Sequence, residues 1–121
     1  MAAGLLAAQQ AGRGEVAGTA PLRFALLFSG HLPAAPGLRA LLADAGPLRV
    51  PSLHCHGAGD RQLSAAQHAE LEAAFGAGGR ERIAHAHGHL IPSQRGQVRR
   101  YAAFVRRACG GAGAGDETEH E

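Results

Sequence analysis

Three short apolar runs, each closed by glycine or proline, constrain the fold of this chain more than any other feature. Such runs are typical of strands buried on both faces of a sheet. A stretch with apolar residues at helical spacing follows each run, so the sequence predicts the order β-α-β-α-β-α and the class α/β. The expected strands are residues 23–29, 49–56 and 82–87, and the expected helices are residues 38–45, 64–75 and 98–108.

Local signals mark the ends of the expected helices. Ser64, with Gln67 three residues later, has the pattern of a capping box, in which the serine side chain bonds the backbone of the first helical turn and the glutamine side chain bonds back. Gly46 and Pro47 follow the first helix, where glycine and proline end helices. The first two crossover helices therefore have defined limits.

The expected folded domain covers most of the chain. Residues 1–108 carry the apolar pattern, and residues 109–121 are predicted to form a disordered, acidic tail rich in Gly and Ala. Residues 2–9 are predicted to form about two helical turns, and residues 9–21 a loop. Three strands are few for a parallel sheet of this class, and the first strand would present a bare edge. We therefore expect another segment or partner to pair with that edge.

Composition excludes several classes of function. Aromatic residues make up only 4% of the chain and Trp is absent, so stacking platforms for nucleic-acid bases are not expected. The 12 basic residues are all Arg and are scattered rather than clustered, which argues against a nucleic-acid footprint. No apolar run is long enough to predict a membrane span. Cys55 and Cys109 show no CxxC spacing and favour free thiols in a reducing compartment, so a cytoplasmic location is expected.

Polar residues that follow the second and third expected strands are the best candidates for chemistry. In open parallel sheets, sites form where the carboxyl ends of neighbouring strands meet. Asp60 lies in a glycine-rich turn after the second strand, and His89 lies in the turn after the third. An acid that holds an imidazole in one tautomer is the orienting half of a hydrolytic triad, and the chain order of acid before histidine fits an α/β-hydrolase.

Three motifs give a more specific resemblance. They are RFALLFSG at 23–30, VPSLHCHGAGD at 50–60 and GHLIP at 88–92. In order and spacing they resemble the C-terminal portion of the FSH-type serine hydrolases, the family that includes the ovarian-cancer-associated esterase. The resemblance implies an α/β-hydrolase fold, hydrolysis of a carboxylic ester without a cofactor, Asp60 as the triad acid and His89 as the general base. The chain departs from the family pattern at His87, where glycine is usual, and at Ala58, where an acid is common.

The nucleophile of such a triad is missing from the sequence. Members of the family carry it as the serine of a G-x-S-x-G turn, and no such motif occurs in the 121 residues. Ser29 ends an expected strand and is the candidate substitute for this nucleophile. The simpler interpretation is a hydroxyl that forms a hydrogen bond at the end of the strand. We therefore expect the chain to be catalytically inactive alone, and the alternative is a noncatalytic remnant or interaction module.

The histidines suggest a third possibility, a metal site. Because side chains alternate along a strand, His54 and His56 would share one face, as would His85, His87 and His89. If the two sets faced the same side, imidazole nitrogens would be available for Zn²⁺. Strand histidines are more often packing residues, so the leading expectation assigns no metal ligands.

Overall fold

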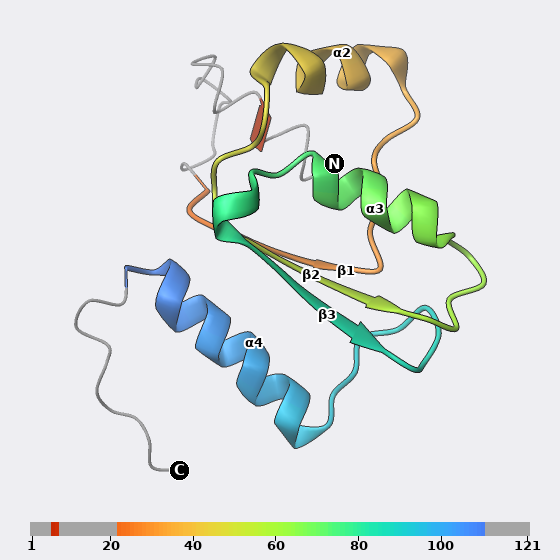
Figure 1. Cartoon of the computed structure of the whole chain (residues 1–121), viewed down its shortest axis with the longest axis vertical. Coiled ribbons are helices and arrows are strands. Elements are labelled where there is room, and N and C mark those ends of the chain that lie inside the picture. The colour runs from red at the N-terminus through yellow and green to blue at the C-terminus, as the bar shows by residue number, and fades with distance from the viewer. Residues whose placement is uncertain (1–5, 8–21, 111–121) are drawn as a thin grey trace.

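The computed structural model describes residues 6–7 and 22–110, and within them the predicted alternation is confirmed (Figure 1). The three strands form one parallel sheet in the order β1-β2-β3. The elements are β1 Ala25–Phe28, α2 Pro36–Ala45, β2 Ser52–Gly57, α3 Ala65–Ala73, the short 3-10 helix η1 Ala77–Gly79, β3 Arg80–His85 and α4 Arg95–Ala108.

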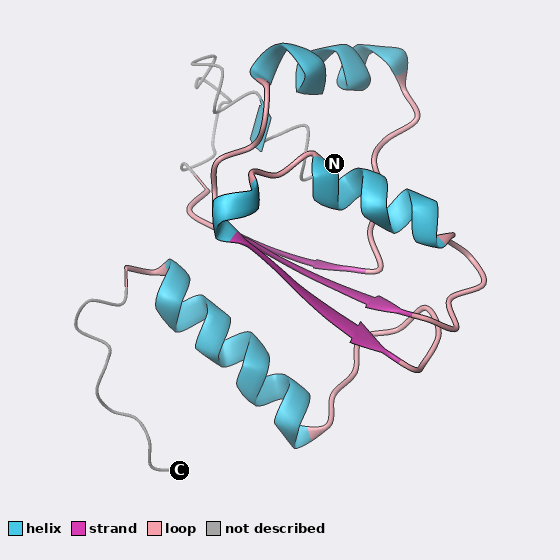
Figure 2. Cartoon of the chain, viewed as in Figure 1, coloured by secondary structure: helices cyan, strands magenta, loops and turns pink. Residues whose placement is uncertain are grey.

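Helices cover both faces of the sheet, as expected of parallel strands. Helices α2 and α3 lie on one side and α4 on the other, and all three strands point the same way (Figures 1 and 2). Successive side chains of β2 lie on opposite faces of the sheet and therefore contact different helices. Leu53 and Cys55 pack with Phe104 of α4, whereas the ring of His54 meets that of Phe75 on the opposite face, at 5.0 Å between ring centres.

Two predicted helix ends, the start of α3 and the end of α2, are also confirmed. Helix α3 ends at Ala73 rather than residue 75, and α4 begins at Arg95 rather than residue 98. The Ser64 hydroxyl accepts a hydrogen bond from the backbone N–H of Gln67 at 3.1 Å, and the Gln67 side chain accepts one from the backbone N–H of Ser64 at 2.8 Å. Helix α2 ends before Gly46, which has a positive φ of 72° that favours glycine. These contacts fix where α3 starts, directly after the turn that holds Asp60.

The third strand differs from its prediction at both ends. It begins at Arg80 rather than residue 82 and ends at His85, so His87 lies outside it. The missed residues are Arg80 and Glu81, two charged residues that precede the apolar pattern. The charged groups of Arg80 and Arg82 reach α3, where Arg80 donates to the carbonyl oxygen of Glu72 at 2.7 Å and Arg82 bonds the Glu72 carboxylate.

The terminal predictions fall mostly outside the described residues. Of the helix expected at 2–9, Leu6 and Ala7 are described, and both are helical and buried in the core beneath α2 and α3. The loop expected at 9–21 and all but the first two residues of the tail expected at 109–121 lie outside the described part. Among the described helices, none has the length and apolar character needed to cross a membrane.

Candidate active site

Asp60 lies at the carboxyl end of the sheet, in the turn between β2 and α3. Its Oδ1 atom accepts hydrogen bonds from the backbone N–H groups of Gln62 at 2.8 Å and Leu63 at 3.0 Å. An aspartate that bonds the backbone two and three residues ahead closes its own turn. The side chain is only 1% exposed, so this turn fixes a buried carboxylate whose Oδ2 atom remains available for other partners.

Glycine allows the loop after β3 to cross the end of β2 and approach Asp60. Ala58 N–H donates to the His85 carbonyl at 2.7 Å, and Gly59 N–H donates to the His87 carbonyl at 3.1 Å. These bonds require close contact between the two loops, which lie together beside the strand tips (Figure 2). They hold in place the loop that leads to His89.

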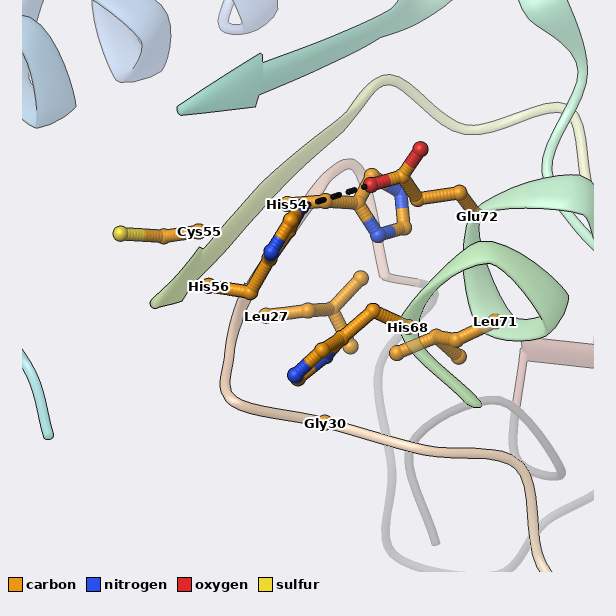
Figure 3. Close-up of a pocket in the computed structure, with 8 residues that line it drawn as sticks. All are labelled: Leu27, Gly30, His54, Cys55, His56, His68, Leu71 and Glu72. Atoms are coloured by element: carbon orange, nitrogen blue, oxygen red, sulfur yellow. Dashed lines mark ion pairs between the residues drawn. The ribbon is translucent and has the colours of Figure 1, made fainter. Parts of the chain in front are cut away.

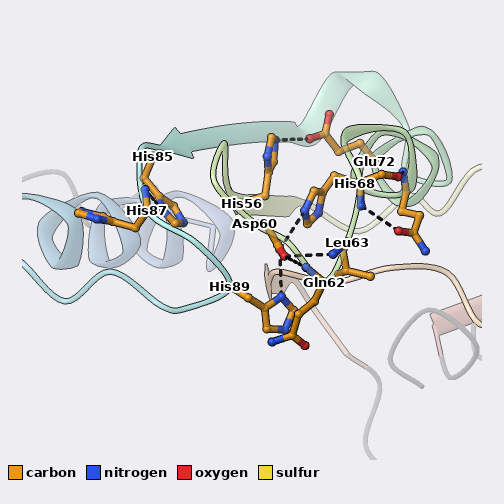
Figure 4. A network of polar contacts seen from close by, with 11 residues as sticks. His56, Asp60, Gln62, Leu63, His68, Glu72, His85, His87 and His89 are labelled. Atoms are coloured by element: carbon orange, nitrogen blue, oxygen red, sulfur yellow. Dashed lines mark hydrogen bonds and ion pairs between the residues drawn. The ribbon is translucent and has the colours of Figure 1, made fainter.

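His89 contacts Asp60 directly. Its Nδ1 atom lies 2.9 Å from Asp60 Oδ2, in a hydrogen bond that leaves the other ring nitrogen, Nε2, free of this contact (Figure 4). The His89 side chain is 33% exposed, against 1% for Asp60. The arrangement is therefore a buried acid that holds a partly exposed imidazole, as in the orienting half of a hydrolytic triad.

The surroundings of Asp60 favour its charged form. Desolvation by burial raises the pKa of this carboxyl, but the hydrogen bonds from His89, Gln62 and Leu63 outweigh it and hold the pKa well below its usual range. Asp60 is thus an anion at neutral pH, and a carboxylate anion can only accept a hydrogen bond from His89 Nδ1. In a neutral imidazole this contact favours the tautomer with the proton on Nδ1 and an unprotonated Nε2.

Comparison with known proteins assigns the family. Residues 1–101 match the family described as Serine hydrolase (FSH1). The chain belongs to this serine hydrolase family. No curated protein and no solved structure matches the sequence. The match confirms the predicted resemblance and the hydrolase class, and it covers the segment that contains both Asp60 and His89.

None of the four serines has the flanking glycines of a G-x-S-x-G turn. Ser29 follows β1 with a left-handed φ of 53°, but its hydroxyl oxygen is buried and makes no hydrogen bond with described residues. Ser52 is fully buried and bonds His54, Ser64 caps α3, and Ser93 is exposed in a loop. A buried hydroxyl does not meet a substrate, so the structure gives no support to Ser29 as a substitute.

The predicted gathering of five imidazoles is wrong. Strand pairing places His54 beside Arg82 and His56 beside Ala84, whereas His85 pairs with Gly57 and shares the α4 face with Ile83. The two histidine sets thus lie on opposite faces, and β3 ends before His87. Within residues 6–7 and 22–110, no group of three or more His, Cys, Asp or Glu residues is arranged to hold a metal ion.

One neighbour of the site was not found by sequence reasoning. His68, on α3, brings its Nε2 atom to 3.3 Å from the same Asp60 Oδ2 that bonds His89. Its position four residues after Ser64 predicts only that it belongs to the second turn of the helix. The signal that places it is the capping box, which starts α3 immediately beside the Asp60 turn.

Proposed function

We propose that this chain supplies the acid and the base of a serine carboxylesterase, with Asp60 as the triad acid and His89 as the general base. The observation that carries the proposal is the 2.9 Å contact between His89 Nδ1 and Asp60 Oδ2 in a member of a serine hydrolase family. The substrate class is a carboxylic ester, and the reaction needs no cofactor.

In this mechanism His89 Nε2 takes the proton of a serine hydroxyl as the serine oxygen attacks the ester carbonyl. The tetrahedral intermediate collapses to an acyl-serine, and His89 returns the proton to the departing alcohol. Water then attacks the acyl group, with His89 again taking and returning one proton, and the acid product leaves. Asp60 keeps its charge throughout and stabilises the imidazolium that forms on His89 in each step.

The serine belongs to a segment carrying G-x-S-x-G, which is absent from the 121 residues. We propose that this segment pairs with β1. Among the described strands, β1 pairs on one side only, with β2, and its other edge carries backbone groups able to extend a parallel sheet. Pairing there would place the end of the added strand at the edge of the sheet where Asp60 and His89 lie.

The test is complementation. The purified chain is mixed with a family fragment that ends in a G-x-S-x-G strand and its following turn, and a fluorophosphonate probe and an aryl ester report on the serine. We expect no labelling of the chain alone, and labelling with ester turnover in the mixture. His89→Gln should abolish turnover, and His87→Gln should retain it. Labelling of the chain alone, or equal turnover by the His89 variant, would contradict the proposal.

A noncatalytic role is the second candidate, favoured by the buried hydroxyl of Ser29 and the missing elbow. It predicts a stable monomer that binds no G-x-S-x-G fragment. The same mixture, examined by size-exclusion chromatography, distinguishes the two candidates.

A further inference from the structure

We propose that His68 is a positioning residue that acts through Asp60. It holds the Oδ2 atom of the carboxylate from the side of α3, so that the carboxylate stays aimed at His89. The inference rests on the proposed function, in which Asp60 and His89 work as a pair. It adds a second histidine to the acid of that pair.

Two imidazoles converge on one oxygen atom. Asp60 Oδ2 lies 2.9 Å from His89 Nδ1 and 3.3 Å from His68 Nε2, and the two rings approach it from different sides (Figure 4). The His68 nitrogen is buried and makes no hydrogen bond with the described residues, so the Asp60 carboxylate is the acceptor within its reach. A buried polar nitrogen without a partner is costly, and with its proton on Nε2 a small rotation of either side chain would complete this bond.

Contacts with neighbouring side chains hold the ring of His68 in place. The ring stacks on that of His56, with 4.6 Å between centres and 17° between planes. His56 Nε2 in turn lies 3.4 Å from Glu72 Oε2 (Figure 3). Arg82 holds the Glu72 carboxylate through both oxygens at 2.7 to 3.1 Å. An unbroken row of contacts therefore runs from Arg82 on β3 to the Asp60 carboxylate.

Exposure separates the roles of the two histidines. The side chain of His68 is 5% exposed, whereas that of His89 is 33% exposed. A ring as buried as that of His68 does not contact a substrate. The His68 ring limits rotation of the Asp60 carboxylate, whose Oδ1 atom already accepts hydrogen bonds from the backbone of Gln62 and Leu63. Once His68 Nε2 also bonds Oδ2, both oxygens are held and the carboxylate has one orientation relative to His89.

The test measures the solvent-exchange rate of the His89 Nδ1 proton by NMR in the ¹⁵N-labelled 121-residue chain. His68→Phe keeps an aromatic ring that can stack on His56 but removes the Nε2 donor. His68→Gln loses the ring but places an amide N–H near the former Nε2. We expect exchange to be about tenfold faster in the Phe variant, the size of effect that loss of one charge-assisted hydrogen bond produces, and near the wild-type rate in the Gln variant.

A packing role for His68 predicts the reverse order, with the Phe variant unchanged and the Gln variant faster, and that result would overturn the inference. Equal rates in all three proteins would overturn it as well.

Asp60→Asn separates this inference from the proposed function. If Asp60→Asn leaves the His89 proton unchanged, the Asp60 and His89 pair itself is wrong. If Asp60→Asn accelerates exchange and His68→Phe does not, only the role of His68 is wrong. Thermal melts confirm that each variant is folded.

Discussion

Gly57 lies directly against the backbone of His87, so closely that a Cβ atom at position 57 would stand 2.1 Å from the His87 carbonyl oxygen. The Gly88 carbonyl oxygen would be 2.6 Å from the same atom. Both obstacles are backbone and lie in the loop that leads to His89. Close approach at the tip of β2 is therefore a condition for bringing the two candidate triad residues together.

Substitution of Gly57 by Ala should destabilise the protein strongly. We expect a loss of about 3 kcal/mol in the free energy of unfolding, because the loop before His89 must move to admit the methyl group. Urea denaturation followed by circular dichroism measures it. Gly37→Ala is the matched control, since among the described residues a Cβ at this position of α2 would have no atom within 4 Å beyond its chain neighbours and its own helix backbone. It should be neutral or slightly stabilising, and equal losses in both variants would contradict the close approach.

Two glutamates of α3 should respond differently to substitution by Gln. Glu72 is 6% exposed and bonds Arg82 through both oxygens, so Glu72→Gln should cost about 2 kcal/mol of unfolding free energy. Glu70 pairs with Arg39 where both side chains are nearly half exposed, and Glu70→Gln should have little measurable effect. Urea midpoints compare the two, and a Glu70 variant as destabilised as the Glu72 variant would show that burial does not decide the difference.

His54 should make the fold sensitive to mild acid. Burial lowers its pKa from 6.5 to about 4, with nearby Arg80 acting in the same direction. Between these values the unfolded chain binds a proton that the folded chain does not. Stability should therefore fall as the pH drops from about 6.5 to about 4, by up to about 3 kcal/mol. Asp60 and Glu72, whose pKa values lie below their usual range, add a further loss as the pH falls below the ordinary values of these carboxyls.

The pH dependence can be assigned with one variant. His54→Gln does not titrate and retains an amide that can bond Ser52, so its unfolding free energy should change less between neutral pH and about pH 5. His31→Gln, at an exposed site, should keep the wild-type dependence. An unchanged slope in the His54 variant would assign the acid sensitivity to other groups.

Much of the fold followed from local signals in the sequence. The order of strands and helices along the chain and the parallel arrangement followed from the alternation of strand and helix patterns. The start of α3 followed from Ser64 and Gln67, because capping signals act within a few residues. The proximity of Asp60 and His89 followed from a general rule about strand ends, although their distance and burial did not. Their roles stay a prediction that the complementation experiment tests.

The features that were missed depend on register and on long side chains. His85 faces α4 because β2 and β3 pair with Gly57 beside it, which strand periodicity alone does not fix. The first two residues of β3, Arg80 and Glu81, were missed because both are charged, although the long Arg80 side chain reaches the Glu72 carbonyl of α3. His68 was missed because its partner lies across a turn whose closure depends on the Asp60 side chain.

The most direct test of the central claim is the tautomer of His89, read from the ¹⁵N shifts of its ring in the full chain at about pH 8, where an ordinary imidazole is neutral. If Asp60 orients His89, the proton will reside on Nδ1 in the wild-type chain, and Asp60→Asn will remove this preference. A proton on Nε2, or the same Nδ1 preference in the Asn variant, would contradict the assignment of Asp60 and His89 as the acid and base of a hydrolase.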